Sequence, residues 1–175
     1  GVFILEVPHL LNIYNENQYD NIFHEHIGFH SLKSIIDLSN KNNLRVFDVE
    51  KIDSQGGSIR CYIKKRDTVR KISKKIKSLI LKEKRLGLFK PKKLIKFRRK
   101  ILAHKSQLSN LISKLKTKRK KISVYGASGK GQALLQYCNL DNNYIDYVFD
   151  KSKLKQGRYT PGTNIRIKDP KNINK

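Results

Sequence analysis

Apolar and polar residues alternate in three different ways along the chain, and the first pattern covers residues 1–65. The expected elements, in order, are a buried parallel strand over 2–7 that Pro8 ends, loop or short helix over 9–30, a helix from Ser31 to near residue 43, and strands over 44–49 and 58–64. Gln55-Gly56-Gly57 marks the turn into the last strand. This order is typical of the back half of an α/β sheet, so we expect the chain to begin within a domain.

Residues 66–121 have helical periodicity instead. The first apolar stripe comprises Val69, Ile72, Ile76, Leu79 and Ile80, and the second comprises Leu94, Phe97, Ile101, Leu108, Leu111 and Leu115. His104 interrupts the second stripe. Because Gly87 and Pro91 separate the two stripes, the pattern predicts an antiparallel helical hairpin with its lysines on the outer faces.

Residues 122–175 return to an α/β pattern. A strand over 122–127 leads into Gly126-Ala127-Ser128-Gly129-Lys130-Gly131, and a helix over 132–137 and a strand over 144–149 follow. This is the pattern of the first βαβ unit of a Rossmann-like sheet, in which glycines let the backbone approach a ligand at a helix N-terminus. The turn matches neither G-x-G-x-x-G nor the P-loop, because Ser128 and Gln132 occupy required positions. A polar, turn-rich stretch containing Thr160-Pro161-Gly162 comes next.

The net charge of +25 comes almost entirely from the middle of this 175-residue chain. Residues 64–121 contain 25 basic and 2 acidic side chains. Such a face could bind phosphate backbones or anionic lipid. It could equally be a solvated face that reflects composition, since the chain has 29 Lys, 20 Ile and 14 Asn but 3 Ala. Both interpretations stay open, and aromatic residues that would stack on single strands are sparse here.

Composition also excludes several classes of protein. No apolar run approaches the length of a membrane span, and the opening segment lacks a basic leader and a cleavage site, so we expect a cytoplasmic protein. Cys61 and Cys138 form no CxxC pair and are expected to be small core residues. His24-Glu25-His26 is the densest titratable cluster. An HExxH zinc motif would need His where the chain has Gly28, so the local sequence favours hydrogen-bonded loop residues over a metal site.

Five motifs together resemble one family: EVPHLL, NQYDNIFHEHIGFHSLKSI, VFDVEKIDSQGGSIRCYIKK, VYGASGKGQALLQYC and DYVFDKSKLKQGRYTPGTNI. They resemble, in order, the C-methyltransferases that act on nucleotide-linked deoxysugars. The resemblance implies an N-terminal zinc-binding domain, a central S-adenosylmethionine (SAM) methyltransferase domain of class I and a C-terminal Rossmann-like domain. Residues 1–65 would be the end of the second domain, 66–121 a basic helical connector and 122–175 the start of the third.

The same resemblance implies catalytic roles for the aromatic-His-Glu-His loop. Methylating a carbon next to a ketone requires removal of a proton to give an enolate, and an imidazole suits that task. His26 is the candidate base, Glu25 its orienting or alternative partner, and His24 completes the cluster. Phe23 occupies a position at which family members usually have Tyr.

The expected substrate is a nucleotide-linked sugar, with thymidine diphosphate as the expected carrier. The candidate substrate-binding residues are Phe23, Gly126, Ala127, Ser128, Gly129, Lys130, Gly131, Tyr159, Thr160, Pro161 and Gly162. We expect the glycine turn to hold the diphosphate while the loop around Thr160 closes over it.

The SAM site and the zinc ligands of this family would lie upstream of Gly1, so we expect this chain to be inactive by itself. Neither nucleic acid nor membrane is an expected partner. Two alternatives remain, a basic polyanion-binding module and a nucleotide-binding, oxidoreductase-like domain that uses the glycine turn.

Overall fold

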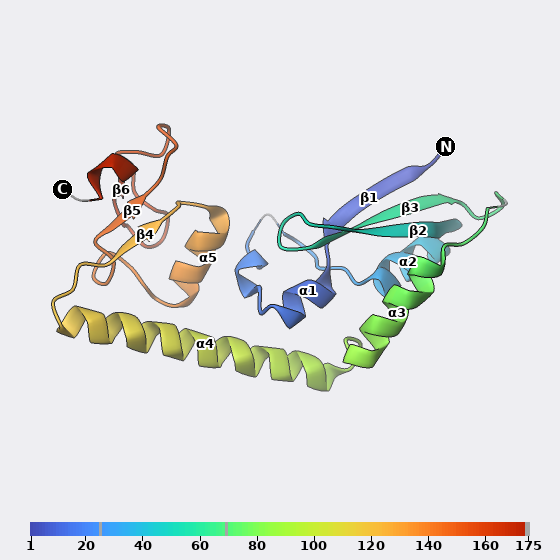
Figure 1. The fold of residues 1–175 in the computed structure, drawn as a ribbon, viewed down its shortest axis with the longest axis horizontal. Helices are drawn as coiled ribbons and strands as arrows, with labels where there is room; N and C mark the ends of the chain where they lie inside the picture. Colours follow the sequence, from blue (N-terminus) through green and yellow to red (C-terminus); the bar gives the residue numbers. More distant parts are fainter. Residues whose placement is uncertain (25, 69, 174–175) are drawn as a thin grey trace. The chain divides into compact units, whose positions relative to one another are not determined.

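The computed structural model describes residues 1–24, 26–68 and 70–173 (Figure 1). It is a mixed α/β structure with two small sheets, which confirms the expected fold class. The chain forms two compact units. The first comprises Gly1–Gln18 and the described part of His26–Arg98, and the second the described parts of Tyr19–Glu25 and Arg99–Lys175. Among the described helices, none combines the length and the apolar character needed to cross a membrane.

The first unit is built on a sheet with the strand order β1-β3-β2, formed by β1 (Phe3–Pro8), β2 (Leu44–Ile52) and β3 (Ser58–Lys65). The central strand β3 is antiparallel to both neighbours, so β1 and β2 run in the same direction. Cys61 lies opposite Leu5 on one side and Val49 on the other, and it is fully buried, as expected.

The expected first strand therefore exists, but its burial and its pairing were predicted wrongly. Phe3 and Ile4 are each 55% exposed, and within the described residues β1 pairs only with the antiparallel β3. A short apolar run does not distinguish a buried central strand from an apolar edge strand, because pairing depends on distant residues.

Helices α2 (Leu32–Lys41) and α3 (Lys74–Leu86) pack against β2 and against each other (Figure 1). Ser31 is the N-cap of α2, as predicted, and its hydroxyl accepts a hydrogen bond from the Ser34 N–H. A short helix, α1 (Leu10–Asn15), follows β1. The buried apolar side chains of this unit are Leu11, Ile13, Tyr14, Leu32, Ile35, Val46, Phe47, Val49, Ile59, Cys61, Ile63, Ile76, Leu79, Leu88 and Phe97.

The predicted break between the two basic helices is confirmed, whereas their side-by-side packing is not seen. α3 ends at Gly87, whose φ of 71° is left-handed, and α4 (Pro91–Thr117) begins at the proline. In the described structure α3 has its extended contacts with β2 and α2 rather than with α4. The apolar residues of α4 instead contribute to the cores of both units. Phe97 packs against Tyr14 in the first unit, and Ile112 belongs to the core of the second.

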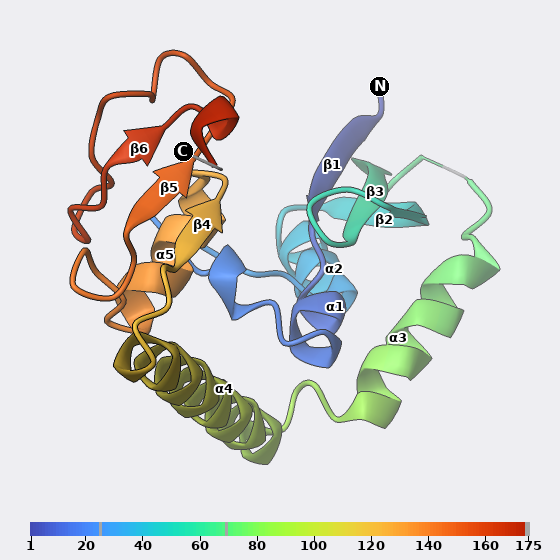
Figure 2. The same cartoon turned by 60° about the vertical axis from the view of Figure 1, so that its left-hand side comes forward.

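The second unit contains three parallel strands in the order β4-β5-β6 (Figure 2). Its elements are β4 (Ser123–Tyr125), α5 (Gly129–Tyr137), β5 (Tyr147–Phe149), β6 (Ile167–Lys168) and the 3-10 helix η2 (Pro170–Asn172). The βαβ unit β4-α5-β5 confirms the sequence pattern. Strand β6 was not predicted, because two residues are too few to show any periodicity. The core residues are Ile112, Leu135, Cys138, Leu140, Ile145, Val148, Ile165 and Ile167.

The 3-10 helix η1 (Tyr19–Asn21) belongs to this second unit and packs on α5. The Tyr19 hydroxyl lies 2.7 Å from Nδ1 of His104, and burial raises the pKa of Tyr19 well above its ordinary value. This contact explains why a histidine interrupts the apolar stripe of α4, since it supplies the polar partner that a buried tyrosine hydroxyl needs.

Candidate functional site

The glycine turn of the second unit joins β4 to α5, as the sequence predicts. Gly126 has φ of 97°, a conformation that side chains other than glycine rarely adopt. Ser128 is the N-cap of α5, and its hydroxyl accepts a hydrogen bond from the Gly131 N–H at 3.1 Å. The first turn of a helix with this kind of start is suited to an anionic group.

Phe23 and Gly129, both candidate substrate-binding residues, come together in the second unit. A Cβ atom at Gly129 would lie 3.1 Å from the ring of Phe23, so a larger residue there would push against the aromatic side chain. The ring of His24 packs edge-on to Phe23, with 5.8 Å between the ring centroids. The structure thus places the beginning of the aromatic-His-Glu-His loop against the glycine turn.

The remaining members of the histidine cluster are placed less completely. His26 belongs to the first unit, where the centroid of its ring is 6.0 Å from the ring centroid of Phe29. Glu25 lies outside the described residues. Within the described residues, no group of three or more His, Cys, Asp or Glu side chains is arranged to hold a metal ion.

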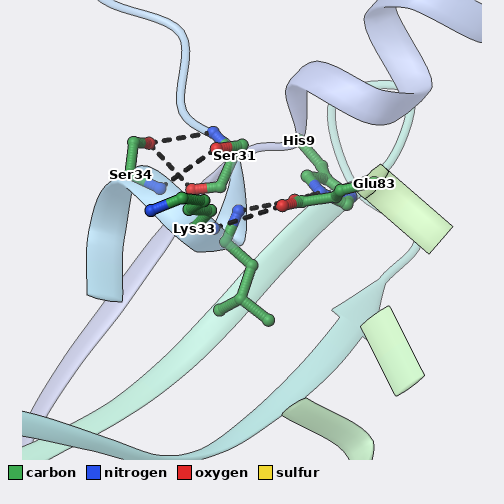
Figure 3. Close-up of polar contacts among 6 residues, drawn as sticks. His9, Ser31, Lys33, Ser34 and Glu83 are labelled. Atoms are coloured by element: carbon green, nitrogen blue, oxygen red, sulfur yellow. Dashed lines mark hydrogen bonds and ion pairs between the residues drawn. The ribbon is translucent and has the colours of Figure 1, made fainter. Parts of the chain in front are cut away.

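A buried carboxylate fixes the base of the loop that carries these histidines (Figure 3). Glu83 of α3 accepts hydrogen bonds from the backbone N–H groups of Leu32 and Lys33, at 2.6 and 3.2 Å, and its Oε1 is 2.8 Å from Nε2 of His9. Glu83 and His9 are both fully buried. The Leu10 N–H also donates a hydrogen bond to the His30 carbonyl. The two ends of the loop, next to Leu10 and His30, are therefore held together.

Sequence reasoning missed Glu83, although the sequence holds a signal for it. Glu83 is the sole acidic residue between positions 68 and 121, in a stretch otherwise rich in lysine and arginine. A lone carboxylate on the apolar side of a basic helix is a candidate for a buried cap, because burial of a carboxylate requires partners.

Asp150 stabilises the glycine turn through hydrogen bonds, and it too was not assigned to the site from the sequence. Its carboxylate accepts hydrogen bonds from the N–H groups of Ser152 and Ala127, at 2.8 and 2.7 Å. Lys155 Nζ lies 3.4 Å from the same carboxylate and donates to the Ala127 carbonyl at 2.8 Å. The backbone hydrogen bonds from Ser152 and Ala127, followed by Lys155, hold the pKa of Asp150 below its ordinary value.

The lowered pKa of Asp150 predicts a pH dependence for this turn. A carboxylate whose pKa is depressed by folding stabilises the folded state above its ordinary pKa of 3.8, and that contribution is lost as the pH falls through the folded pKa. Asp150→Asn should therefore lower the thermal midpoint of unfolding at neutral pH. As the pH falls below 3.8, the midpoint of the variant should also decrease less than that of the wild-type protein. Midpoints of both proteins across this pH range measure it, and parallel profiles would contradict the assignment.

The loop that follows Asp150 is docked on α5 beside the turn. Gly162 has φ of 74°, and Gln136 Nε2 donates a hydrogen bond to the Pro161 carbonyl at 2.8 Å. Loop and turn border an open hollow of about 280 Å³. It is lined by Ala127, Ser128, Gly129, Gln132, Lys155, Arg158, Tyr159, Thr160, Pro161 and Ile167. Most of the candidate substrate-binding residues thus border one hollow, while Phe23 lies against the turn.

A second, open groove of about 680 Å³ lies between β2 and α3 in the first unit. Its lining includes four lysines, Lys51, Lys74, Lys75 and Lys82, together with Glu50. All four lysines are exposed. Lys74, Lys75 and Lys82 belong to α3, where the sequence predicts lysines on the outer face, whereas Lys51 belongs to β2. This is the surface that a polyanion-binding function would use.

Comparison with known proteins identifies the family. Residues 53–175 match the family model described as the C-methyltransferase C-terminal domain. The chain is also similar to C-methyltransferase NovU of Streptomyces niveus, with 32% identity over 170 residues, or 97% of this chain. It spans 40% of the length of that relative. The chain that carries the capped glycine turn and its hollow therefore belongs to the C-methyltransferase family.

Proposed function

We propose that the intact protein transfers a methyl group from SAM to a carbon of a nucleotide-linked keto-deoxysugar. The observation that supports this most is the contact of Phe23, in the aromatic-His-Glu-His loop, with Gly129 of the capped glycine turn. In a chain of the C-methyltransferase family, this contact connects a loop with candidate acid-base groups to a turn suited to phosphate.

In this proposal the histidine loop removes a proton from the sugar. An imidazole nitrogen of His26 takes the proton from the carbon next to the ketone. The electron pair of that C–H bond forms a double bond to the carbonyl carbon, and the C=O π electrons move onto the ketone oxygen to give an enolate. The enolate carbon is then the nucleophile that forms the new C–C bond, and the bond between the methyl carbon and the sulfonium sulfur of SAM would break with its electron pair left on sulfur, so that S-adenosylhomocysteine would leave. Glu25 is assigned the role of orienting the imidazole or accepting the proton from it.

None of the described residues is assigned to the methyl donor. Gly56 and Gly57 belong to the turn between the antiparallel strands β2 and β3, not to a strand-to-helix turn. In the intact protein, SAM would supply an electrophilic methyl group from another part of the chain, and zinc would likewise be held outside this segment.

The glycine turn is assigned to the diphosphate of the nucleotide sugar. Ser128 starts α5, and Lys130 adds a full positive charge in its first turn. A positive helix end and an ammonium group together favour phosphate oxygens, which are acceptors only.

Lys130→Ala in the full-length enzyme should raise the Michaelis constant for a thymidine-diphosphate sugar roughly 10- to 100-fold, the effect of losing one charge-assisted contact. The affinity for SAM should not change. Lys153→Ala, which removes an exposed lysine from the neighbouring loop, is the matched control. Steady-state kinetics with each substrate varied in turn measures the effect, and an unchanged constant for the sugar would refute the assignment of the turn.

A further inference from the structure

The segment that leads into the aromatic-His-Glu-His loop is held in the second unit by one tyrosine. Tyr19 belongs to η1, which packs on α5, and it is 8% exposed. Its ring packs edge-on to Tyr137 of α5, with 5.5 Å between the ring centroids. Its hydroxyl lies 2.7 Å from Nδ1 of His104 in α4. Tyr19 therefore connects the start of this segment to residues of two helices within the same unit.

The contact between Tyr19 and His104 is a directional one. A largely buried phenol needs a hydrogen-bond partner, and burial raises the pKa of Tyr19, so the hydroxyl keeps its proton and can donate to Nδ1. His104 lies at an exposed position of α4, so packing of the core does not account for a histidine there. The hydrogen bond to Tyr19 does account for it.

A short, tightly turned stretch of backbone joins Tyr19 to Phe23 and His24. The Ile22 N–H donates to the Tyr19 carbonyl at 3.0 Å, and the Phe23 N–H donates to the Asn21 carbonyl at 3.1 Å. The ring of Phe23 lies against Gly129 of the glycine turn, and His24 packs on that ring. Because the turn leaves little slack, the position of Tyr19 restricts where the beginning of the histidine loop can lie.

We propose that Tyr19 and His104 are positioning residues for the methyl transfer, and that their hydrogen bond holds the beginning of the histidine loop at the glycine turn. Neither side chain is assigned a contact with the substrate. The inference rests on the proposed function, because it takes this loop to be the source of the general base. It adds a residue of α4, outside both the loop and the turn, to those on which turnover depends. A small displacement of an acid-base group from the reacting atom lowers the rate strongly, so loss of the hydrogen bond should be measurable in kcat.

Kinetics of the full-length enzyme tests this with three variants. Tyr19→Phe keeps the ring and removes only the hydroxyl, and it should lower kcat about 10-fold while the Michaelis constant for the thymidine-diphosphate keto sugar changes less than about 2-fold. His104→Leu should have the same effect, and the double variant should lose no more than either single variant, because both remove one interaction. His104→Asn should restore most of the turnover, since its amide oxygen can replace Nδ1 as the acceptor.

Ser109→Ala is the matched control for a general loss of stability. The Ser109 hydroxyl on α4 donates to the Cys138 carbonyl at the end of α5, at 3.1 Å, and this bond does not involve residues 19–24. The control variant should therefore keep the wild-type kcat even where its thermal midpoint falls. Hydrogen exchange gives a readout independent of activity. In Tyr19→Phe and His104→Leu, peptides that cover residues 19–24 should exchange faster, while those that cover β4 and β5 should keep the wild-type rate.

The outcomes separate this inference from the proposed function. Wild-type turnover in Tyr19→Phe would overturn the inference and leave the proposed function in place. An equal loss of turnover in Ser109→Ala, no recovery in His104→Asn, or unchanged exchange over residues 19–24 would do the same. If the wild-type enzyme neither transferred a methyl group nor exchanged the hydrogen next to the ketone, the proposed function would fail together with this inference.

Discussion

Glu83→Ala should destabilise the first unit by about 3–5 kcal/mol, the usual cost of removing one partner from a buried, hydrogen-bonded charged group. The substitution leaves the N–H groups of Leu32 and Lys33 and the ring of His9 without their acceptor in a site that water does not reach. Hydrogen exchange of the full-length protein should then become about 10²- to 10⁴-fold faster in peptides that cover α2 and β2.

Glu6→Ala is the control for this prediction. Glu6 pairs with Arg60 on the surface, where both side chains are more than one third exposed, and loss of such a pair costs about 1 kcal/mol or less. Exchange should therefore change little in that variant. If the two variants behaved alike, the Glu83 carboxylate would not be the buried anchor of the loop that carries the histidines.

His26→Ala should lower turnover by the full-length enzyme about 100-fold or more, if His26 is the general base. The affinities for SAM and for the nucleotide should be unchanged, because the imidazole acts on the proton of the sugar and not on either anchoring group. A second measurement follows the proton directly. The wild-type enzyme should exchange the hydrogen next to the ketone with deuterium from heavy water, and the variant should not.

His30→Ala, which removes a histidine from the same loop, is the matched control. The His30 backbone carbonyl, which bonds to the Leu10 N–H, is kept in that variant. It should retain both turnover and deuterium exchange. Wild-type turnover in His26→Ala would instead make the His-Glu-His cluster a set of hydrogen-bonded loop residues.

Local signals in the sequence predicted most of the secondary structure. The helix after Ser31, the hairpin turn at Gly56-Gly57 and the βαβ unit around the glycine turn each depend on residues close together in the chain. Caps, turn residues and periodicity act over such short distances, so they can be identified without the tertiary structure. The resemblance of the motifs likewise gave the family, which the comparisons then confirmed.

What could not be predicted depends on contacts between distant residues. The exposed edge position of β1 depends on its pairing with β3, and the role of Glu83 depends on its contacts with His9 and Leu32. Gln132 was noted only as a departure from the P-loop pattern. Its burial beside Thr163, which donates to its Oε1, depends on residues about thirty positions away in the chain.

Transfer of a labelled methyl group tests the central claim most directly. The full-length protein would be incubated with SAM carrying a ¹³C-methyl group and a thymidine-diphosphate-linked keto-deoxysugar, and the product examined by carbon-proton correlation NMR. We predict a labelled methyl group bonded to the sugar carbon next to the ketone, with loss of the hydrogen that this carbon carried. A methyl group found on oxygen or nitrogen would contradict the proposed function, as would the absence of transfer to any nucleotide-linked keto sugar.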